Sequence, residues 1–144
     1  MRALVTEFIG TFFLVLTIAL AVASGSTLAP VAIGAMLMVM VYMGGHVSGA
    51  HYNPAVTIAV YIRGKHKLGQ VVPYWVAQLA GAIVASIFAA ALVGKSFHPA
   101  PGAGVSTLMA VLTEVVFTFA LASVVLNVAT HRKTVLLVTL FFTL

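Results

Sequence analysis

Long, almost uncharged apolar stretches constrain this chain more than any other feature of its sequence. Of its 144 residues, 62% are hydrophobic and only 6% are charged. A helix needs about 20 apolar residues to cross a bilayer. Four stretches approach that length, at residues 4–23, 30–45, 71–93 and 107–129, and a fifth opens near residue 135. We therefore predict an all-α membrane protein, a single domain over residues 1–144, with four full transmembrane helices and the start of a fifth span.

The basic residues predict how these spans are oriented. If the chain alternates across the membrane, Lys95 faces one side and six basic residues face the other: Arg2, Arg63, Lys65, Lys67, Arg132 and Lys133. Basic loops stay in the cytoplasm, so we expect a multi-pass protein of the cell membrane, plasma or bacterial inner, with a cytoplasmic N-terminus. Basic residues this dispersed do not form the surface that a nucleic-acid partner needs. The chain has no cysteine, which excludes thiolate metal sites and thiol catalysis.

A short apolar segment separates the second span from the third. Residues 56–62 are far too few to cross the bilayer, which is typical of a re-entrant segment. Asn53 is a preferred N-cap and Pro54 a preferred first helical residue, so a helix is predicted to begin here, with Ala55 in its first turn. About nine residues span about 14 Å, roughly half of a hydrocarbon core about 30 Å thick. This re-entrant half-helix therefore begins near the midplane and ends at Arg63, on the cytoplasmic side.

The residues before the half-helix are predicted to line water. Residues 44–50 are too glycine-rich for a lipid-facing helix, and irregular backbone at this depth is tolerated only where protein shields it or where it lines a cavity. The carbonyls of Gly49, Ala50 and His51 would offer acceptors to a permeating molecule, and the Asn53 amide would offer a donor. The positive end of the half-helix dipole points to the same place and opposes cations and protons. A small neutral solute is the expected cargo.

The chain contains an internal repeat. Residues 6–14 and 113–121 match at five of nine positions, and the only acidic residues of the chain, Glu7 and Glu114, fall at the same place in both copies. Because the first span runs outward and the fourth inward, the copies have opposite orientation, as in inverted-repeat transport folds. We predict a first repeat over residues 1–93 and a partial second repeat over residues 107–144. The rest of the second repeat would follow Leu144.

Four stretches of the sequence resemble the major intrinsic protein family, the aquaporins and aquaglyceroporins: residues 45–57 with Asn-Pro-Ala, residues 7–12, residues 74–82, and Thr113-Glu114. The resemblance covers essentially the whole chain. It implies a right-handed bundle of six spans and two half-helices, usually a homotetramer with a separate pore in each subunit. It also implies that Glu7 and Glu114 hydrogen-bond the re-entrant loops from behind. We expect His46, Ser48 and Gln78 to support the loop as well.

The resemblance also bears on selectivity. It places Ile33, twenty residues before Asn53, at the second-span position of the narrow selectivity filter. Water-specific members usually have an aromatic ring there, so an aliphatic side chain favours wider permeability. We predict a passive channel for water and small neutral solutes, with a facilitator of glycerol or another small polyol as the alternative. The fifth-span filter residue, the second Asn-Pro-Ala loop and the filter arginine would lie beyond Leu144, so a non-conducting fragment is a further alternative for these residues alone.

Other functions fit the residues less well. An intramembrane hydrolase would use Ser48 as nucleophile, but Ser48 lacks the glycine two residues before it and has no acid nearby, so we do not expect an enzyme. His46 and His51 alone make a weak metal site, and no metal or cofactor is expected. Glu7 and Glu114 could relay protons, but support of the loops is favoured. A packing subunit without a pore is the remaining alternative.

Overall fold

The computed structural model of the chain describes residues 1–95 and 100–128, and these contain five α-helices and no strand. The helices are α1 (Arg2–Ala23), α2 (Ala29–Ser48), α3 (Pro54–Ile62), α4 (Leu68–Val93) and α5 (Thr107–Val128). All except α3 are long and apolar enough to cross a membrane. The predicted all-α membrane fold is confirmed. The predicted fifth span lies outside the described residues, and the repeat boundaries stay predictions.

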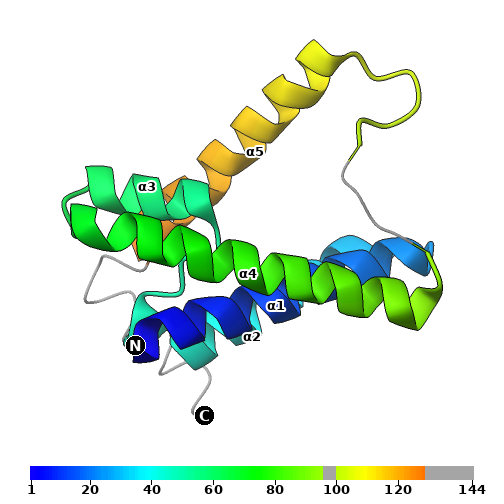
Figure 1. Cartoon of the computed structure of the whole chain (residues 1–144). Coiled ribbons are helices and arrows are strands. Elements are labelled where there is room, and N and C mark those ends of the chain that lie inside the picture. The colour runs from blue at the N-terminus through cyan, green and yellow to red at the C-terminus, as the bar shows by residue number, and fades with distance from the viewer. Residues whose placement is uncertain (96–99, 129–144) are drawn as a thin grey trace, which may run out of the picture.

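Three of the long helices lie side by side. α1 packs against both α2 and α4, and α4 runs in the same direction as α1 while α2 runs in the opposite direction (Figure 1). The N-terminus and the turn of residues 63–67 between α3 and α4 therefore lie at the same end of the bundle (Figure 1). The basic residues of these two segments share one end, as the charge pattern predicts.

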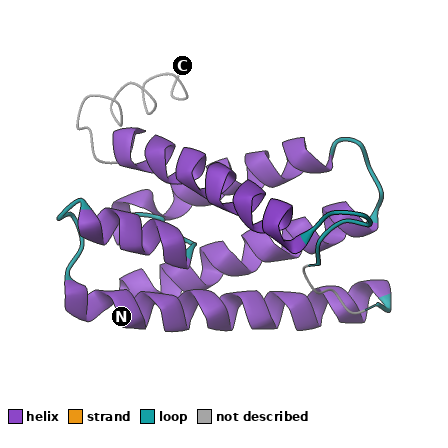
Figure 2. Cartoon of the chain, turned by 90° about the horizontal axis from the view of Figure 1, so that it is seen from above, coloured by secondary structure: helices purple, strands orange, loops and turns teal. Residues whose placement is uncertain are grey.

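The short helix α3 covers only part of the length of α4. It packs against α4 and α5, begins toward the middle of the bundle and ends at the same end as the N-terminus (Figures 1 and 2). α5 packs against α3, and none of its residues is buried within the described part of the chain. A half-length helix whose first turn lies inside the bundle is the geometry that the re-entrant prediction requires.

Close backbone contact holds α1 against α4. A Cβ atom built on Gly81 of α4 would lie 2.5 Å from the carbonyl oxygen of Phe8 and 3.2 Å from the backbone nitrogen of Phe12. The ring of Phe12 then packs beside that of Phe88, with centroids 6.2 Å apart. Small residues let membrane helices approach in this way, and dispersion contacts accumulate over the shared surface.

The second helix corrects one expectation about the loop. α2 continues through Gly44 and Gly45 to Ser48, so that only residues 49–53 are irregular, rather than residues 44–50. Gly44 is required for close packing, because a Cβ atom there would overlap the hydroxyl of Tyr52. A Cβ atom on Gly10 of α1 would overlap the same ring. The glycines at this depth therefore make room for a buried tyrosine and leave the helix unbroken.

Gly81→Ala should destabilise the α1–α4 contact by about 1–3 kcal/mol, because the added methyl group meets backbone atoms that no side-chain rotation can move. Gly69→Ala, near the start of the same helix, is the matched control. Nothing lies within 4 Å of a Cβ atom at Gly69, and alanine favours a helix over glycine by up to about 1 kcal/mol. Thermal unfolding in detergent, followed by circular dichroism, should show a lower midpoint for Gly81→Ala alone. Equal midpoints would contradict the close contact.

Candidate functional site

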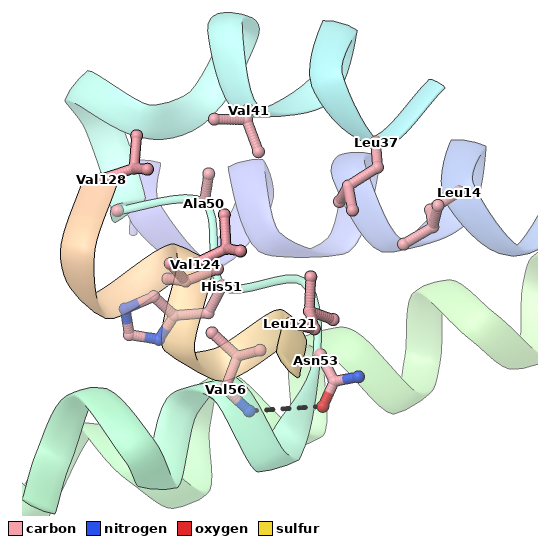
Figure 3. A pocket seen from close by; sticks show the side chains of 12 residues that line it. Leu14, Leu37, Val41, Ala50, His51, Asn53, Val56, Leu121, Val124 and Val128 are labelled. Carbon is pink, nitrogen blue, oxygen red and sulfur yellow. Dashed lines mark hydrogen bonds between the residues drawn. The ribbon is translucent and has the colours of Figure 1, made fainter. Parts of the chain in front are cut away.

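The start of α3 is built around Asn53. Its side-chain oxygen accepts hydrogen bonds from the backbone N–H groups of Ala55 at 2.7 Å and Val56 at 3.4 Å, the second of which is drawn in Figure 3. Pro54 occupies the first helical position, where its missing N–H leaves nothing unpaired. The carbonyl of Pro54 accepts a hydrogen bond from the indole nitrogen of Trp75 in α4 at 3.1 Å. The oxygen of Asn53 thus caps the helix, and its amide nitrogen is left for another partner.

The loop of residues 49–53 has an unusual backbone. Gly49 ends α2 with φ of 88°, and two non-glycine residues, Ala50 and Tyr52, have φ of 52° and 48°. The left-handed region costs an L-residue about 1–2 kcal/mol, and such residues persist only where the surrounding structure fixes them. The hydrogen bonds behind the loop provide this restraint.

Glu7 of α1 is fully buried behind the loop. One carboxylate oxygen accepts hydrogen bonds from the Ser48 hydroxyl at 2.6 Å and the His51 N–H at 3.0 Å. The other accepts from the Tyr52 N–H at 2.7 Å and the side-chain nitrogen of Gln78 at 2.8 Å. Hydrogen bonds to a carboxylate are stronger than those between neutral groups. Four neutral donors therefore satisfy a carboxylate that has no cationic partner among the described residues.

Thr57 extends this network into α3. Its hydroxyl oxygen accepts a hydrogen bond from the Gln78 side-chain nitrogen at 3.0 Å and lies 3.2 Å from Nδ1 of His51. The same hydroxyl donates to the carbonyl of Asn53 at 3.1 Å. Because the Gln78 nitrogen also binds Glu7, side chains of α1, α3 and α4 meet at one point. The loop is thus held from behind by three helices.

The carbonyls of the loop divide into paired and unpaired groups. Those of Ser48 and Tyr52 accept hydrogen bonds from the Tyr74 hydroxyl at 2.8 Å and the Thr11 hydroxyl at 3.3 Å. Between them, the carbonyls of residues 49–51 accept no hydrogen bond from any residue that the structure describes. Three successive acceptors are therefore left for a partner outside the described chain.

A pocket of about 170 Å³ lies in front of the loop (Figure 3). Residues 49–51 and Asn53 line one wall, and apolar side chains of four helices line the rest: Leu14 of α1, Leu37 and Val41 of α2, Val56 of α3, and Leu121, Val124, Val125 and Val128 of α5. Polar groups therefore come from one side only. Such a wall can exchange hydrogen bonds with a small neutral molecule while the apolar side offers none.

Ile33 is half-buried in α2 and does not line this pocket. It precedes Leu37 and Val41, which do, by four and eight residues, and residues four apart share one face of a helix. Ile33 therefore continues the pocket-lining stripe of α2 toward the start of that helix.

Two of the predicted support residues lie apart from the loop. His46 is exposed on α2, and its ring forms no hydrogen bond with the described residues. Glu114 is likewise exposed on α5, in contrast to the buried Glu7. The other predicted support residues, Ser48 and Gln78, both bind Glu7 directly. Among the described residues, no group of three His, Asp or Glu side chains could hold a metal ion.

Sequence reasoning missed three side chains that build the site. Tyr52 fills the space above two glycines, and its hydroxyl donates to the carbonyl of Met40 at 2.8 Å. Tyr74 precedes Gln78 by four residues, so a polar pair on one face of an otherwise apolar span was the available signal. Thr57 follows the N-cap by four residues, and this spacing allows its hydroxyl to reach the N-cap carbonyl.

The chain is similar along almost its whole length to known proteins. Residues 1–143 match the family described as major intrinsic protein. The chain is 37% identical over 144 residues to glycerol uptake facilitator protein-like 6 of Lactiplantibacillus plantarum, covering 91% of the chain and 65% of that protein. It is 37% identical over 148 residues to aquaporin NIP2-1 of Oryza sativa subsp. japonica, covering 94% of the chain and 48% of that protein. It is 35% identical over 162 residues to aquaporin AqpM of Methanothermobacter thermautotrophicus, covering 90% of the chain and 65% of that protein. The chain therefore spans less than two thirds of the length of these relatives. It belongs to the major intrinsic protein family.

Proposed function

We propose that this chain forms one wall of a passive membrane channel for water and small neutral solutes. One observation carries the proposal: residues 49–51, whose carbonyls have no partner among the described residues, line a pocket together with Asn53. The names of the relatives, two aquaporins and a glycerol uptake facilitator-like protein, support the same class of cargo. Residues 49–51 and the half-helix of residues 53–62 are the parts proposed to contact the permeating molecule.

A molecule that enters the pore loses hydrogen bonds to bulk water, and the carbonyls and the Asn53 amide replace them. The N-terminus of α3 carries the positive end of the helix dipole, equivalent to about half an elementary charge. Cations and protons meet this positive end without a compensating anion, because no acidic side chain lines the pocket among the described residues. A neutral solute meets no such barrier.

The hydrolase alternative is disfavoured by the partners of Ser48. Its hydroxyl donates to the Glu7 carboxylate and accepts a hydrogen bond from the Ala50 N–H at 3.1 Å. It is buried and does not line the pocket, so a substrate there would not reach it. No histidine hydrogen-bonds Ser48 in the described part of the chain, and a serine nucleophile needs an adjacent base. We therefore propose a channel and no enzyme.

The proposal extends to topology and assembly. We propose that the end formed by the N-terminus and residues 63–67 faces the cytoplasm, because basic loops favour that side. We also propose that a second inverted repeat supplies the facing wall of the pore, supported by relatives of which the chain covers only 48–65%. A homotetramer in the cell membrane stays a prediction from the family.

Asn53→Asp tests the proposed function. The new carboxylate keeps the capping oxygen but replaces the amide donor, so water should still pass while protons and cations leak, because negative charge beside the helix N-terminus attracts them. The protein encoded by the gene for this chain would be reconstituted in proteoliposomes. Stopped-flow light scattering would measure their water permeability, and an internal pH dye would measure the leakage of protons. Asn127→Asp on the exposed face of α5 is the matched control. If the wild-type protein gave the water permeability of empty liposomes, the proposed channel function would be contradicted.

A second candidate, a facilitator of glycerol or another small polyol, is favoured by Ile33. An aliphatic side chain on the pocket-lining stripe of α2 leaves more room than an aromatic ring would. The similarity to a glycerol uptake facilitator-like protein supports this alternative.

Ile33→Phe should reduce glycerol uptake by about tenfold or more while leaving water permeability largely intact. The larger ring narrows the pore, and each ~1.4 kcal/mol added to the barrier lowers the rate about tenfold. Ile87→Phe on the exposed face of α4, a helix that contributes no residue to the pocket, adds the same group elsewhere and serves as control. Both solutes would be measured by light scattering of the same proteoliposomes. If Ile33→Phe left glycerol uptake unchanged, the assignment of Ile33 to the selectivity filter would be contradicted.

Glu7→Gln tests the proposed support of the loop. In glutamine, an NH₂ group replaces one of the two acceptor oxygens of the carboxylate. Because this NH₂ group would face two hydrogen-bond donors, the free energy of unfolding of the 144-residue chain should fall by on the order of 3 kcal/mol. Glu114→Gln makes the same change at an exposed position and should leave stability unchanged. Thermal unfolding in detergent compares the two variants. A Glu7→Gln chain as stable as the wild type would show that the loop does not need the carboxylate.

A further inference from the structure

Exposed basic side chains gather at one end of the bundle. Arg63, Lys65 and Lys67 belong to the turn between α3 and α4, and each is exposed. Arg2 is exposed as well and lies at the same end, where α1 begins (Figure 1). We call these four residues the basic patch. Like charges repel one another unless an anion compensates them, so the patch is suited to an anionic partner.

No acidic side chain of the chain compensates the basic patch. The only acidic residues are Glu7 and Glu114. Glu7 is fully buried, and its carboxylate already accepts hydrogen bonds from four neutral donors. Glu114 lies in the first half of α5, which begins toward the opposite end of the bundle (Figures 1 and 2). Within residues 1–95 and 100–128, the four cations of the patch form no ion pair.

The turn that carries most of the patch has a defined backbone. Gly64 has φ of 74°, in the left-handed region that glycine adopts without strain. Its N–H donates to the carbonyl of Tyr61 at 2.8 Å, and the Lys65 N–H donates to the carbonyl of Val60 at 3.1 Å. These two bonds form a Schellman motif, which closes the end of α3. Hydrogen bonds therefore fix the backbone from which the basic side chains extend.

His66 fastens the same turn to the bundle. It is half-buried, whereas the cations on either side of it are exposed. The centroid of its ring lies 4.5 Å from that of Tyr74 in α4 and 4.9 Å from that of His51 in the loop, and both pairs meet edge-on. A turn held in this way loses little conformational freedom when it binds a ligand, which favours binding.

The patch lies at the edge of an exposed apolar surface. Ile62, directly before Arg63, is 76% exposed, and Leu68, directly after Lys67, is 67% exposed. Val72 continues this surface along α4 and is 62% exposed. In a bilayer such apolar side chains contact hydrocarbon, and basic side chains at the ends of spans reach the headgroup region. The cations therefore lie at the depth of lipid phosphates, where a lipid fits better than a soluble anion.

We propose that the basic patch binds the headgroups of anionic lipids in the leaflet that it faces. The phosphate of such a lipid accepts hydrogen bonds from the paired N–H groups of the Arg63 guanidinium and from the lysine ammonium groups. Clusters of cations beside a span attract anionic lipids in this way. The bound lipid also holds the end of the half-helix, because Arg63 is the C-cap of α3 and Lys67 the N-cap of α4. This interaction does not require conduction, so it stands apart from the proposed function.

Trp75 provides a probe for the bound lipid. It is the only tryptophan in the sequence, and it is half-buried. It follows Lys67 by eight residues in α4, a rise of about 12 Å from the turn. Bromine atoms on the acyl chains of a lipid quench tryptophan fluorescence at short range. Trp75 therefore reports which lipid lies against this part of α4.

The test uses the 144-residue chain in bilayers of equal amounts of phosphatidylcholine and phosphatidylglycerol, with bromine on one lipid at a time. We expect brominated phosphatidylglycerol, the anionic lipid, to quench Trp75 more strongly than brominated phosphatidylcholine. Each cation near an anionic surface favours binding about fivefold, so Lys65→Gln should lower this preference about fivefold. Lys65→Gln combined with Lys67→Gln should abolish most of it. Lys95→Gln, at an exposed position beyond the other end of α4, removes one charge and should keep it.

Equal quenching by the two brominated lipids in the wild type would overturn the proposal, and so would a preference that the double variant leaves unchanged. About 1 M NaCl, which screens charges beyond about 3 Å, should weaken the preference; a preference that resists this salt would show that the patch does not bind the headgroup. Inorganic phosphate, added at constant ionic strength, should leave the preference intact. If phosphate removed it, the patch would be a site for a soluble anion instead. Far-UV circular dichroism checks that the helices are formed in each variant.

Discussion

The carboxylate of Glu7 is the interaction on which the rest of the site depends. An ion inside a membrane protein is costly unless it is paired or fully hydrogen-bonded, and here four neutral donors from the end of α2, the loop and α4 surround it. Two of these donors are consecutive backbone N–H groups, which can both reach Glu7 only if the loop takes its unusual conformation. The positive φ angles of Ala50 and Tyr52 are therefore a consequence of satisfying one buried charge.

The same conformation determines how closely the helices pack. The backbone conformation at Tyr52 places its ring between α1 and α2. Only glycine at positions 10 and 44 leaves space for this ring. The hydroxyl then donates to the carbonyl of Met40, so a buried polar group is paired inside the apolar bundle. Binding of the loop to Glu7 and approach of the two helices are thus parts of one arrangement, and neither would hold without the other.

Local features of this site were predictable from the sequence, whereas contacts across the fold were not. The cap at Asn53 and the half-length of α3 follow from residue types and spacing within ten residues, and the long apolar helices follow from composition. The glycines at 44 and 45 were interpreted as irregular backbone, because nothing in the local pattern tells that Gly44 lies beneath a tyrosine eight residues later. Tyr52 and Tyr74 were missed for the same reason, since their partners become neighbours only after the loop folds back between α1 and α4.

The network also explains how the proposed channel wall can contain an acid without attracting cations. The charge of Glu7 lies behind the loop, where four hydrogen bonds disperse it. In front of the loop, the nearest electrostatic feature is the N-terminus of α3, whose dipole is positive. The backbone of residues 49–53 therefore separates a buried anion from the pocket, which is lined by residues whose carbonyls accept no hydrogen bond from the described chain. Because these acceptors are partial charges opposite an apolar wall, they compensate a neutral solute for lost water far better than they compensate an ion.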